Sequence, residues 1–139
     1  MIEKGDIIII RDFLKESRPE KPNKIFIVIA NIDGSYSILS AVTSQTYFNE
    51  PIEYGHINFG ENRDLFCFPA GYVIGKNGFS FHKDTFIYLS YNINRLNIEK
   101  LNSYKIDVKD KIKDNIYNEI IEFLTPAVKG KEKQYLIKI

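Results

Sequence analysis

Three side chains at the ends of two predicted strands have the chemistry to handle a phosphate group. Lys24 precedes an apolar run at residues 25–30, and Thr43 and Ser44 follow a second run at residues 36–42. An ammonium group stabilises negative charge on a phosphate, and hydroxyls orient it by hydrogen bonds. The alternative is that all three are ordinary solubilising residues at strand ends. Their role therefore depends on whether the fold brings them together.

The two apolar runs are predicted to form an antiparallel hairpin. Residues 25–30 are apolar and rich in β-branched side chains, as in a strand buried on both faces. Asp33-Gly34 is a tight-turn signal, because glycine has no Cβ and tolerates a positive φ. Antiparallel pairing then places Lys24 beside the polar end of the second strand.

A polar loop at residues 12–23 precedes this hairpin and contains two prolines. It is long for a connection between paired strands, and such loops often carry function. Basic side chains in or beside the loop are candidates to bind substrate: Arg11, Lys15, Arg18 and Lys21. Three acidic residues offset this charge, so the loop either contacts substrate or is simply solvated. Gln45, directly after the hydroxyls, is also expected to bind substrate.

Length and composition indicate one globular domain that spans residues 1–139. The chain is 44% hydrophobic and 27% charged, which is typical of a folded domain with its own core. The net charge is +1, so any nucleic-acid site must be a local patch. Cys67 is the only cysteine, which excludes an intramolecular disulfide, and it is expected in the core.

The apolar segments predict a mainly β fold with a C-terminal helix, as a small antiparallel barrel or a sandwich. The barrel is expected at about residues 1–92 and the helical part at about residues 95–128. Expected strands are residues 7–10, 25–30, 36–42, 65–68, 72–74, 79–81 and 85–91, with a short strand near 56–59 and an edge strand at 135–139. Helices are expected at residues 96–103 and 107–124. The second helix has an apolar stripe that either docks on the barrel or forms a dimer surface.

Aromatic residues at positions 46–64 either stack on bases or plug one end of the barrel. Four such residues are Tyr47, Phe48, Tyr54 and Phe59.

Motifs for several other chemistries are absent from the sequence. It has no GxxxxGK[ST], GxGxxG, HExxH or GxSxG motif and no histidine pair at helical spacing, so no metal site or cofactor is expected. A general base stays unassigned, with His56, His82 and Glu53 as candidates. There is no signal peptide and no apolar run near the about 20 residues that span a bilayer, which favours a cytoplasmic protein without membrane contact.

The order of these features resembles the MazF/PemK family of toxin endoribonucleases and, within that superfamily, its ToxN-like members. Gly5-Asp6 opens an apolar strand, and Lys24 opens the second long strand after the polar loop. Thr43-Ser44 ends the next strand, in Ala-Val-Thr-Ser-Gln. The chain departs from MazF proper, which usually has Arg-Pro at Lys24-Ile25, and its segment at residues 46–78 is longer and less regular.

This resemblance implies an SH3-like barrel that cuts single-stranded RNA without a metal or cofactor. The 2′-hydroxyl would attack the adjacent phosphorus and leave a cyclic phosphate and a 5′-hydroxyl, so DNA would not be cut. Lys24, Thr43 and Ser44 would be catalytic, with Lys24 stabilising the extra charge. The resemblance also implies a toxin–antitoxin or abortive-infection system, with a protein or RNA antitoxin as partner and a possible homo-oligomer.

Two other functions compete with the nuclease. One is a non-catalytic binding or interaction module on the same SH3-like barrel. The other is a different small enzyme, or a phage-encoded inhibitor, that shares only the strand order. Lys24 discriminates the nuclease from the binding module, because a nuclease requires it beside Thr43 in an open groove.

Overall fold

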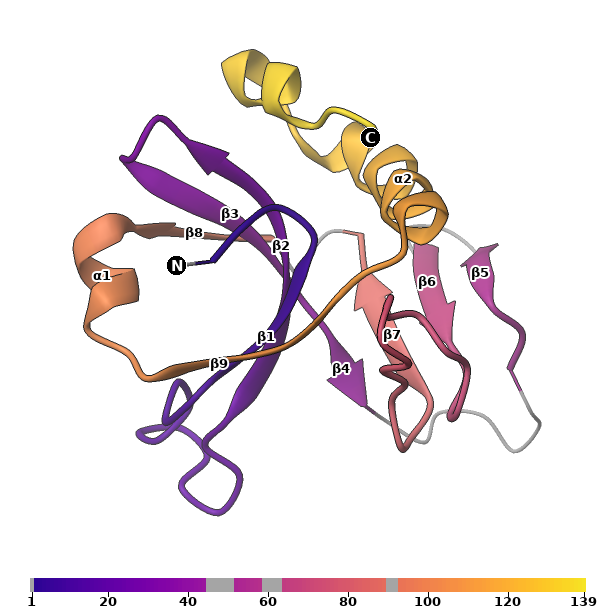
Figure 1. Cartoon of the computed structure of the whole chain (residues 1–139), viewed down its shortest axis with the longest axis horizontal. Helices are drawn as coiled ribbons and strands as arrows, with labels where there is room; N and C mark the ends of the chain where they lie inside the picture. Colours follow the sequence, from indigo (N-terminus) through magenta and orange to yellow (C-terminus); the bar gives the residue numbers. More distant parts are fainter. Residues whose placement is uncertain (1, 45–51, 59–63, 90–92) are drawn as a thin grey trace.

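Two antiparallel sheets and a helix that packs against both make up the fold (Figure 1). The computed structural model describes residues 2–44, 52–58, 64–89 and 93–139. The first sheet has the order β8 (Ile93–Asn97), β3 (Tyr36–Ala41), β2 (Lys24–Ile32), β1 (Asp6–Ile10) and β9 (Ile106–Lys111). The second has the order β4 (Thr43–Ser44), β7 (Thr85–Tyr88), β6 (Asp64–Phe68) and β5 (Gly55–Asn58). The expectation of a mainly β chain with a C-terminal helix is confirmed.

The hairpin of β2 and β3 forms as predicted. Its register runs from Phe26 opposite Ala41 to Ile32 opposite Tyr36. Asp33 and Gly34 form the turn, with φ of 43° and 69°. Both faces of β2 are buried, because alternate side chains belong to two separate hydrophobic clusters. This double burial explains the unbroken apolar run in the sequence.

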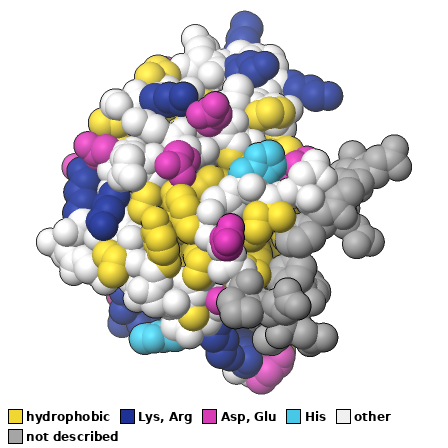
Figure 2. All heavy atoms as spheres, turned by 90° about the vertical axis from the view of Figure 1, so that its right-hand side faces the viewer, with side chains coloured by type: hydrophobic (Ala, Val, Ile, Leu, Met, Phe, Trp, Pro, Cys, Tyr) yellow, Lys and Arg dark blue, Asp and Glu magenta, His cyan; other side chains and the backbone are white. Residues whose placement is uncertain are grey.

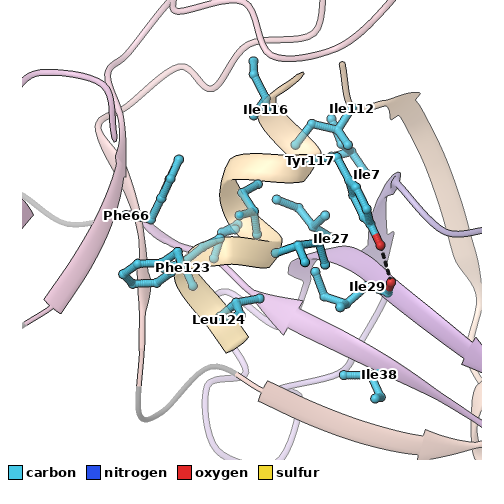
Figure 3. Packing of buried hydrophobic residues seen from close by; sticks show 14 of the residues in the cluster. Ile7, Ile27, Ile29, Ile38, Phe66, Ile112, Ile116, Tyr117, Phe123 and Leu124 are labelled. Carbon is cyan, nitrogen blue, oxygen red and sulfur yellow. Dashed lines mark hydrogen bonds between the residues drawn. The ribbon is translucent and has the colours of Figure 1, made fainter. Parts of the chain in front are cut away.

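Helix α2 (Asp114–Leu124) covers the larger hydrophobic cluster and joins the two sheets (Figure 3). The Tyr117 hydroxyl donates a hydrogen bond to the Ile29 carbonyl of β2, with an O–O distance of 2.6 Å. On the other side, the Phe123 ring lies 5.6 Å from the Phe66 ring of β6. Of the two alternatives for the apolar stripe, docking within the chain is therefore the one observed, and the stripe is not a free dimer surface.

The helical range expected at about residues 95–128 is wrong in part. Residues 93–97 form β8 and only Ile98–Asn102 form helix α1. Residues 106–111 form β9 instead of the first turns of a long helix. This strand pairs with β1, with Ile8 opposite Val108, and so satisfies backbone groups that a helix would leave unpaired. An edge strand with charged side chains resembles a solvated helix face in the sequence, which explains the error.

Three further expected strands are wrong. Residues 72–74 and 79–81 are irregular, and between them only Gly75 forms an isolated bridge, with Ile112. Residues 135–139 form no strand, because the end of the chain follows the short helices η1 (Thr125–Ala127) and η2 (Gly130–Tyr135) and then binds Asn118 of α2. These segments are held in place by turns and by side-chain hydrogen bonds, which the pattern of apolar residues does not reveal.

The Asp110 carboxylate organises the turn at residues 75–79. It accepts hydrogen bonds from the backbone N–H groups of Asn77 and Phe79 and from the Asn77 side-chain amide, at 3.0–3.1 Å. Burial of Asp110 would raise its pKa, but the hydrogen bonds from Phe79, Lys111 and Asn77 outweigh burial and hold the pKa below its usual value. The turn is therefore built around one buried carboxylate.

Hydrophobic side chains gather on the face at the right-hand side of Figure 1, where β5 lies (Figure 2). In this part of the fold, Tyr72 is exposed and stacks on the half-buried Tyr54 at 4.5 Å. The Tyr54 hydroxyl donates to Glu119 of α2, so Tyr54 has a packing role. The other three aromatics considered, Tyr47, Phe48 and Phe59, lie outside the described residues. None of the described helices has the length and apolar character to cross a membrane.

Candidate functional site

A cavity of about 870 Å³, here the Lys24 cavity, lies where β2 begins and β3 runs into β4. Polar and charged side chains dominate its walls. They are Arg18, Lys21, Asn23, Lys24, Thr43, Ser44, Lys83 and Asp84, with Leu14, Ile25, Val42 and Ala70 as the apolar part. In Figure 1 this region is at the lower end of the first sheet, between the loop of residues 12–23 and β4.

Lys24 and Thr43 lie side by side in this cavity, as the hairpin predicts. The Lys24 Nζ donates a hydrogen bond to Thr43 Oγ1 at 3.4 Å. The pairing of β2 and β3 continues one step beyond β3, because the Val42 N–H donates to the Ile25 carbonyl at 3.2 Å. This bond holds Thr43 next to the first residue of β2. The two side chains are therefore positioned by rigid backbone rather than by a loop.

The Lys24 ammonium is half-buried and has no ion pair among the residues that the structure describes. Burial, and then the positive charge of Arg18, lowers the pKa of Lys24 from its ordinary value. An anion entering the cavity would restore part of the lost solvation and pair with both cations. The electrostatics therefore favour a negatively charged ligand.

The two hydroxyls differ in their hydrogen bonds. Ser44 Oγ lies 3.0 Å from Thr85 Oγ1, and the Thr85 hydroxyl donates to the Lys83 carbonyl at 2.8 Å. Because the Thr85 proton is used there, Ser44 must be the donor in their shared bond. Thr43 Oγ1 instead accepts from Lys24, so its own proton is free to donate. Of the two, Thr43 is the hydroxyl ready to bind a phosphate oxygen.

Lys83 and Asp84 are site residues that the sequence reasoning missed. Asp84 is the one carboxylate among the described residues that line the Lys24 cavity. Its Oδ1 accepts a hydrogen bond from the Ala70 N–H at 2.9 Å, which fixes the group in the wall. The available signal was the pair of charged residues before the apolar strand β7, the same pattern that identified Lys24.

The predicted substrate-binding residues divide between two cavities. Arg18 and Lys21 line the Lys24 cavity, whereas Arg11 and Lys15 line a second cavity of about 700 Å³. Arg11 is also engaged, since its Nε donates to Asp107 Oδ2 at 2.7 Å and holds the pKa of that carboxyl below its usual value. Gln45 lies outside the described residues.

None of the three candidate general bases lines the Lys24 cavity. His56 Nε2 lies 2.8 Å from Asp64 Oδ1, and His82 and Glu53 are exposed. Cys67 is buried as expected, and burial, together with the nearby Asp84, raises the pKa of its thiol to about 11. In the described parts of the chain, no group of three or more His, Cys, Asp or Glu side chains is arranged to hold a metal ion.

Comparison with protein-family models and with curated proteins finds no match to this chain. The geometry of the Lys24 cavity is therefore the basis for assigning a function. Its central features are a half-buried ammonium, a hydroxyl with a free proton and one fixed carboxylate. This set of groups is suited to acid–base chemistry on a phosphate ester.

Proposed function

We propose that the protein is a metal-independent endoribonuclease toxin, of the MazF/PemK type and closest to its ToxN-like members. The observation that carries the proposal is the contact of Lys24 with Thr43 on the wall of an open cavity. A binding module would not require a half-buried ammonium without an ion pair beside a free hydroxyl. The cavity also holds three further cations, Arg18, Lys21 and Lys83, that suit a polyanion.

The proposed reaction is attack of a ribose 2′-hydroxyl on the adjacent phosphorus. The new P–O2′ bond forms as the P–O5′ bond breaks, which leaves a 2′,3′-cyclic phosphate and a 5′-hydroxyl. Asp84 accepts the 2′-hydroxyl proton, and the departing 5′-oxygen takes up a proton from water in the open cavity. The hydroxide that this leaves removes the proton from Asp84, which restores the carboxylate. Lys24 and Thr43 donate hydrogen bonds to the non-bridging oxygens, where charge increases in the transition state.

The finer identity of the fold and the partners belongs to the same proposal. We propose that the two sheets are a variant of the SH3-like barrel, because the β2–β3 hairpin and the C-terminal helix occur in the order that the family has. Single-stranded RNA is the substrate and a protein or RNA antitoxin is the partner. Such a toxin would act in the cytoplasm, and a homo-oligomer belongs to the same proposal.

The direct test is cleavage of a diverse single-stranded RNA pool by the purified protein in EDTA. We expect cuts that leave cyclic phosphate and 5′-hydroxyl ends, identified by end-specific ligation and sequencing. The same sequences with a 2′-deoxy or 2′-O-methyl group at the cut site should be resistant, because the nucleophile is gone. RNA binding without cleavage would instead favour the non-catalytic module, and cleavage of DNA would contradict the mechanism.

Thr43 should matter more than Ser44 for cleavage. Thr43→Val keeps the side-chain shape but removes the free hydroxyl, and we expect kcat to fall about 100-fold, as for the loss of one transition-state donor. Ser44→Ala should reduce kcat less than about 10-fold, because its proton is already donated to Thr85. Single-turnover rates of the two variants measure the difference. Equal losses would show that the hydroxyls act alike and would refute this assignment.

Asp84→Asn should lower kcat about 100- to 10,000-fold, the usual range for loss of a general base. The amide oxygen of the replacement can still accept from the Ala70 N–H, so the wall of the cavity should persist. Asp33→Asn is the matched control, since it removes one carboxylate from the exposed hairpin turn, where asparagine tolerates the positive φ. If Asp84→Asn retains wild-type kcat, another group takes the proton.

A further inference from the structure

The second cavity, here the Tyr104 cavity, lies on the other side of the loop of residues 12–23 from the Lys24 cavity. It has a volume of about 700 Å³. The loop and the end of β1 supply one wall, and helix α1 with its connection to β9 supplies the other. Lining residues on the second wall are Lys100, Ser103, Tyr104 and Lys105. Figure 1 shows this connection at the lower left, beside the loop.

The two cavities share the loop as a common wall. Phe13 and Lys15 line the Tyr104 cavity, whereas Leu14 between them lines the Lys24 cavity. The loop is fixed at its base, because the Leu14 N–H donates to the Pro22 carbonyl at 2.7 Å and the Asp12 N–H donates to Asn23 Oδ1 at 3.0 Å. A flexible strand that crosses this ridge passes directly from one cavity to the other.

Charge in the Tyr104 cavity is divided between its walls. The loop wall carries both carboxylates, Asp12 and Glu16, beside the cations Arg11 and Lys15. The other wall carries Lys100 of α1 and Lys105 after it and has no carboxylate among its lining residues. These two lysines have no ion pair within the described parts of the chain. Arg11, in contrast, is neutralised by Asp107. The α1–β9 wall is therefore the side on which an anion would bind.

An aromatic ring lies beside Lys100 on the same wall. Tyr104 is half-buried and stacks on Phe13 with a centroid distance of 5.4 Å and an interplanar angle of 27°. The Lys100 Nζ lies 5.4 Å from the centroid of the Tyr104 ring. Base stacking on an aromatic ring is generally stronger than an exposed cation–π contact. A base can therefore stack on the Tyr104 ring in place of Lys100, and the Lys100 ammonium can then bind the adjoining phosphate.

We infer that the Tyr104 cavity is a subsite for a nucleotide that neighbours the cleaved one in single-stranded RNA. Its base lies against Tyr104, and its phosphate is held by Lys100 and Lys105. This inference rests on the proposed nuclease function, because it takes the Lys24 cavity as the place where the same strand is cut. The subsite lengthens the contact with RNA beyond the scissile phosphate and makes longer substrates bind more tightly.

The test is binding of fluorescent 2′-O-methyl RNA, which cannot be cleaved, measured by anisotropy over a range of NaCl concentrations. For single strands, each phosphate contact contributes about 0.7 to the slope of log K against log salt. The Lys100→Ala/Lys105→Ala double variant releases the one phosphate that both lysines hold, so it should reduce the magnitude of the slope by about 0.7. Lys129→Ala/Lys131→Ala removes the same charge from exposed positions near the C-terminus and should leave the slope unchanged.

Tyr104→Leu separates stacking from charge. We expect it to weaken binding about 10-fold at fixed salt, as for the loss of one stacked base, without a change in the salt slope. Circular dichroism and thermal unfolding establish that each variant is folded, and the lysine variants do not touch the core. Equal slopes for the two double-lysine variants would overturn the subsite, as would an absence of binding by the wild-type protein.

Cleavage kinetics distinguish failure of this inference from failure of the nuclease proposal. If both are correct, Lys100→Ala/Lys105→Ala raises KM for a long RNA and leaves kcat unchanged. Cleavage by the wild type with no change of KM in the double variant would overturn the subsite and leave the nuclease intact. Salt-dependent binding through Lys100 and Lys105 without any cleavage would support the subsite and refute the nuclease.

Discussion

Lys24→Ala is expected to reduce RNA cleavage about 100- to 1,000-fold, the usual cost of removing one donor to a transition-state oxyanion. Lys24 is the cation in contact with Thr43, and it makes no ion pair with a carboxylate of the described residues. Single-turnover rates with RNA above saturation measure the effect on the chemical step. Lys21→Ala, which removes an exposed cation from the same cavity, is the matched control and should lower kcat less than about 10-fold.

Although Lys24→Ala should reduce cleavage, it should not reduce the stability of the fold. Burial lowers the pKa of Lys24, so the unfolded chain holds this proton more tightly than the folded chain does. The charged lysine therefore opposes folding at pH values below the lowered pKa, and this cost disappears as the pH rises towards the ordinary value of 10.5. At neutral pH, Lys24→Ala should keep or raise the Tm.

Cleavage by Lys24→Ala at the wild-type rate would remove the basis of the proposed function.

Among substitutions that add a single methyl group, Gly75→Ala is expected to cause the largest loss of stability, about 3 kcal/mol or more. A Cβ on Gly75 would overlap the Asp110 carboxylate and lie 2.7 Å from Phe79 Cβ. Asp110 cannot move aside without breaking the hydrogen bonds that hold the turn at residues 75–79. Urea unfolding measures the loss, which corresponds to a Tm decrease of about 10 °C for a chain of this size.

Gly34→Ala is the control for this substitution. Gly34 has a φ of 69° and no atom within 4 Å of an added Cβ, so only backbone strain of about 1–2 kcal/mol is expected. A double-mutant cycle identifies the cause, because Gly75→Ala should cost less in the Asp110→Ala background than in the wild type. A cost below about 1 kcal/mol for Gly75→Ala would contradict the close packing at this glycine.

The contact of Lys24 with Thr43 was predictable because every signal for it is local. The apolar run of β2, the Asp33-Gly34 turn and the apolar run of β3 define one hairpin, and a hairpin fixes which ends meet. The side chains at those ends then follow from counting residues. The different hydrogen bonding of Thr43 and Ser44 was not predictable, because it depends on Thr85, which lies far away in the sequence.

The features that could not be predicted depend on contacts between segments that are far apart in the sequence. β9 is a strand because the edge of β1 needs a partner, and its own residues do not reveal that need. Asp84 enters the Lys24 cavity only because β4 pairs with β7 in the second sheet. Tyr104 likewise meets Phe13 through the pairing of β1 with β9. A single sequence contains no direct signal for such pairings.

The hairpin turn offers a place to attach a reporter away from the Lys24 cavity. β2 extends for nine residues from Lys24 to Ile32, so the turn lies about 25 Å along the strand from the cavity. Ser35 is exposed there, while Cys67, the sole native thiol, is buried and hard to ionise. Ser35→Cys should therefore accept a maleimide dye selectively, and the labelled protein could be immobilised by its turn to test the proposed RNA binding.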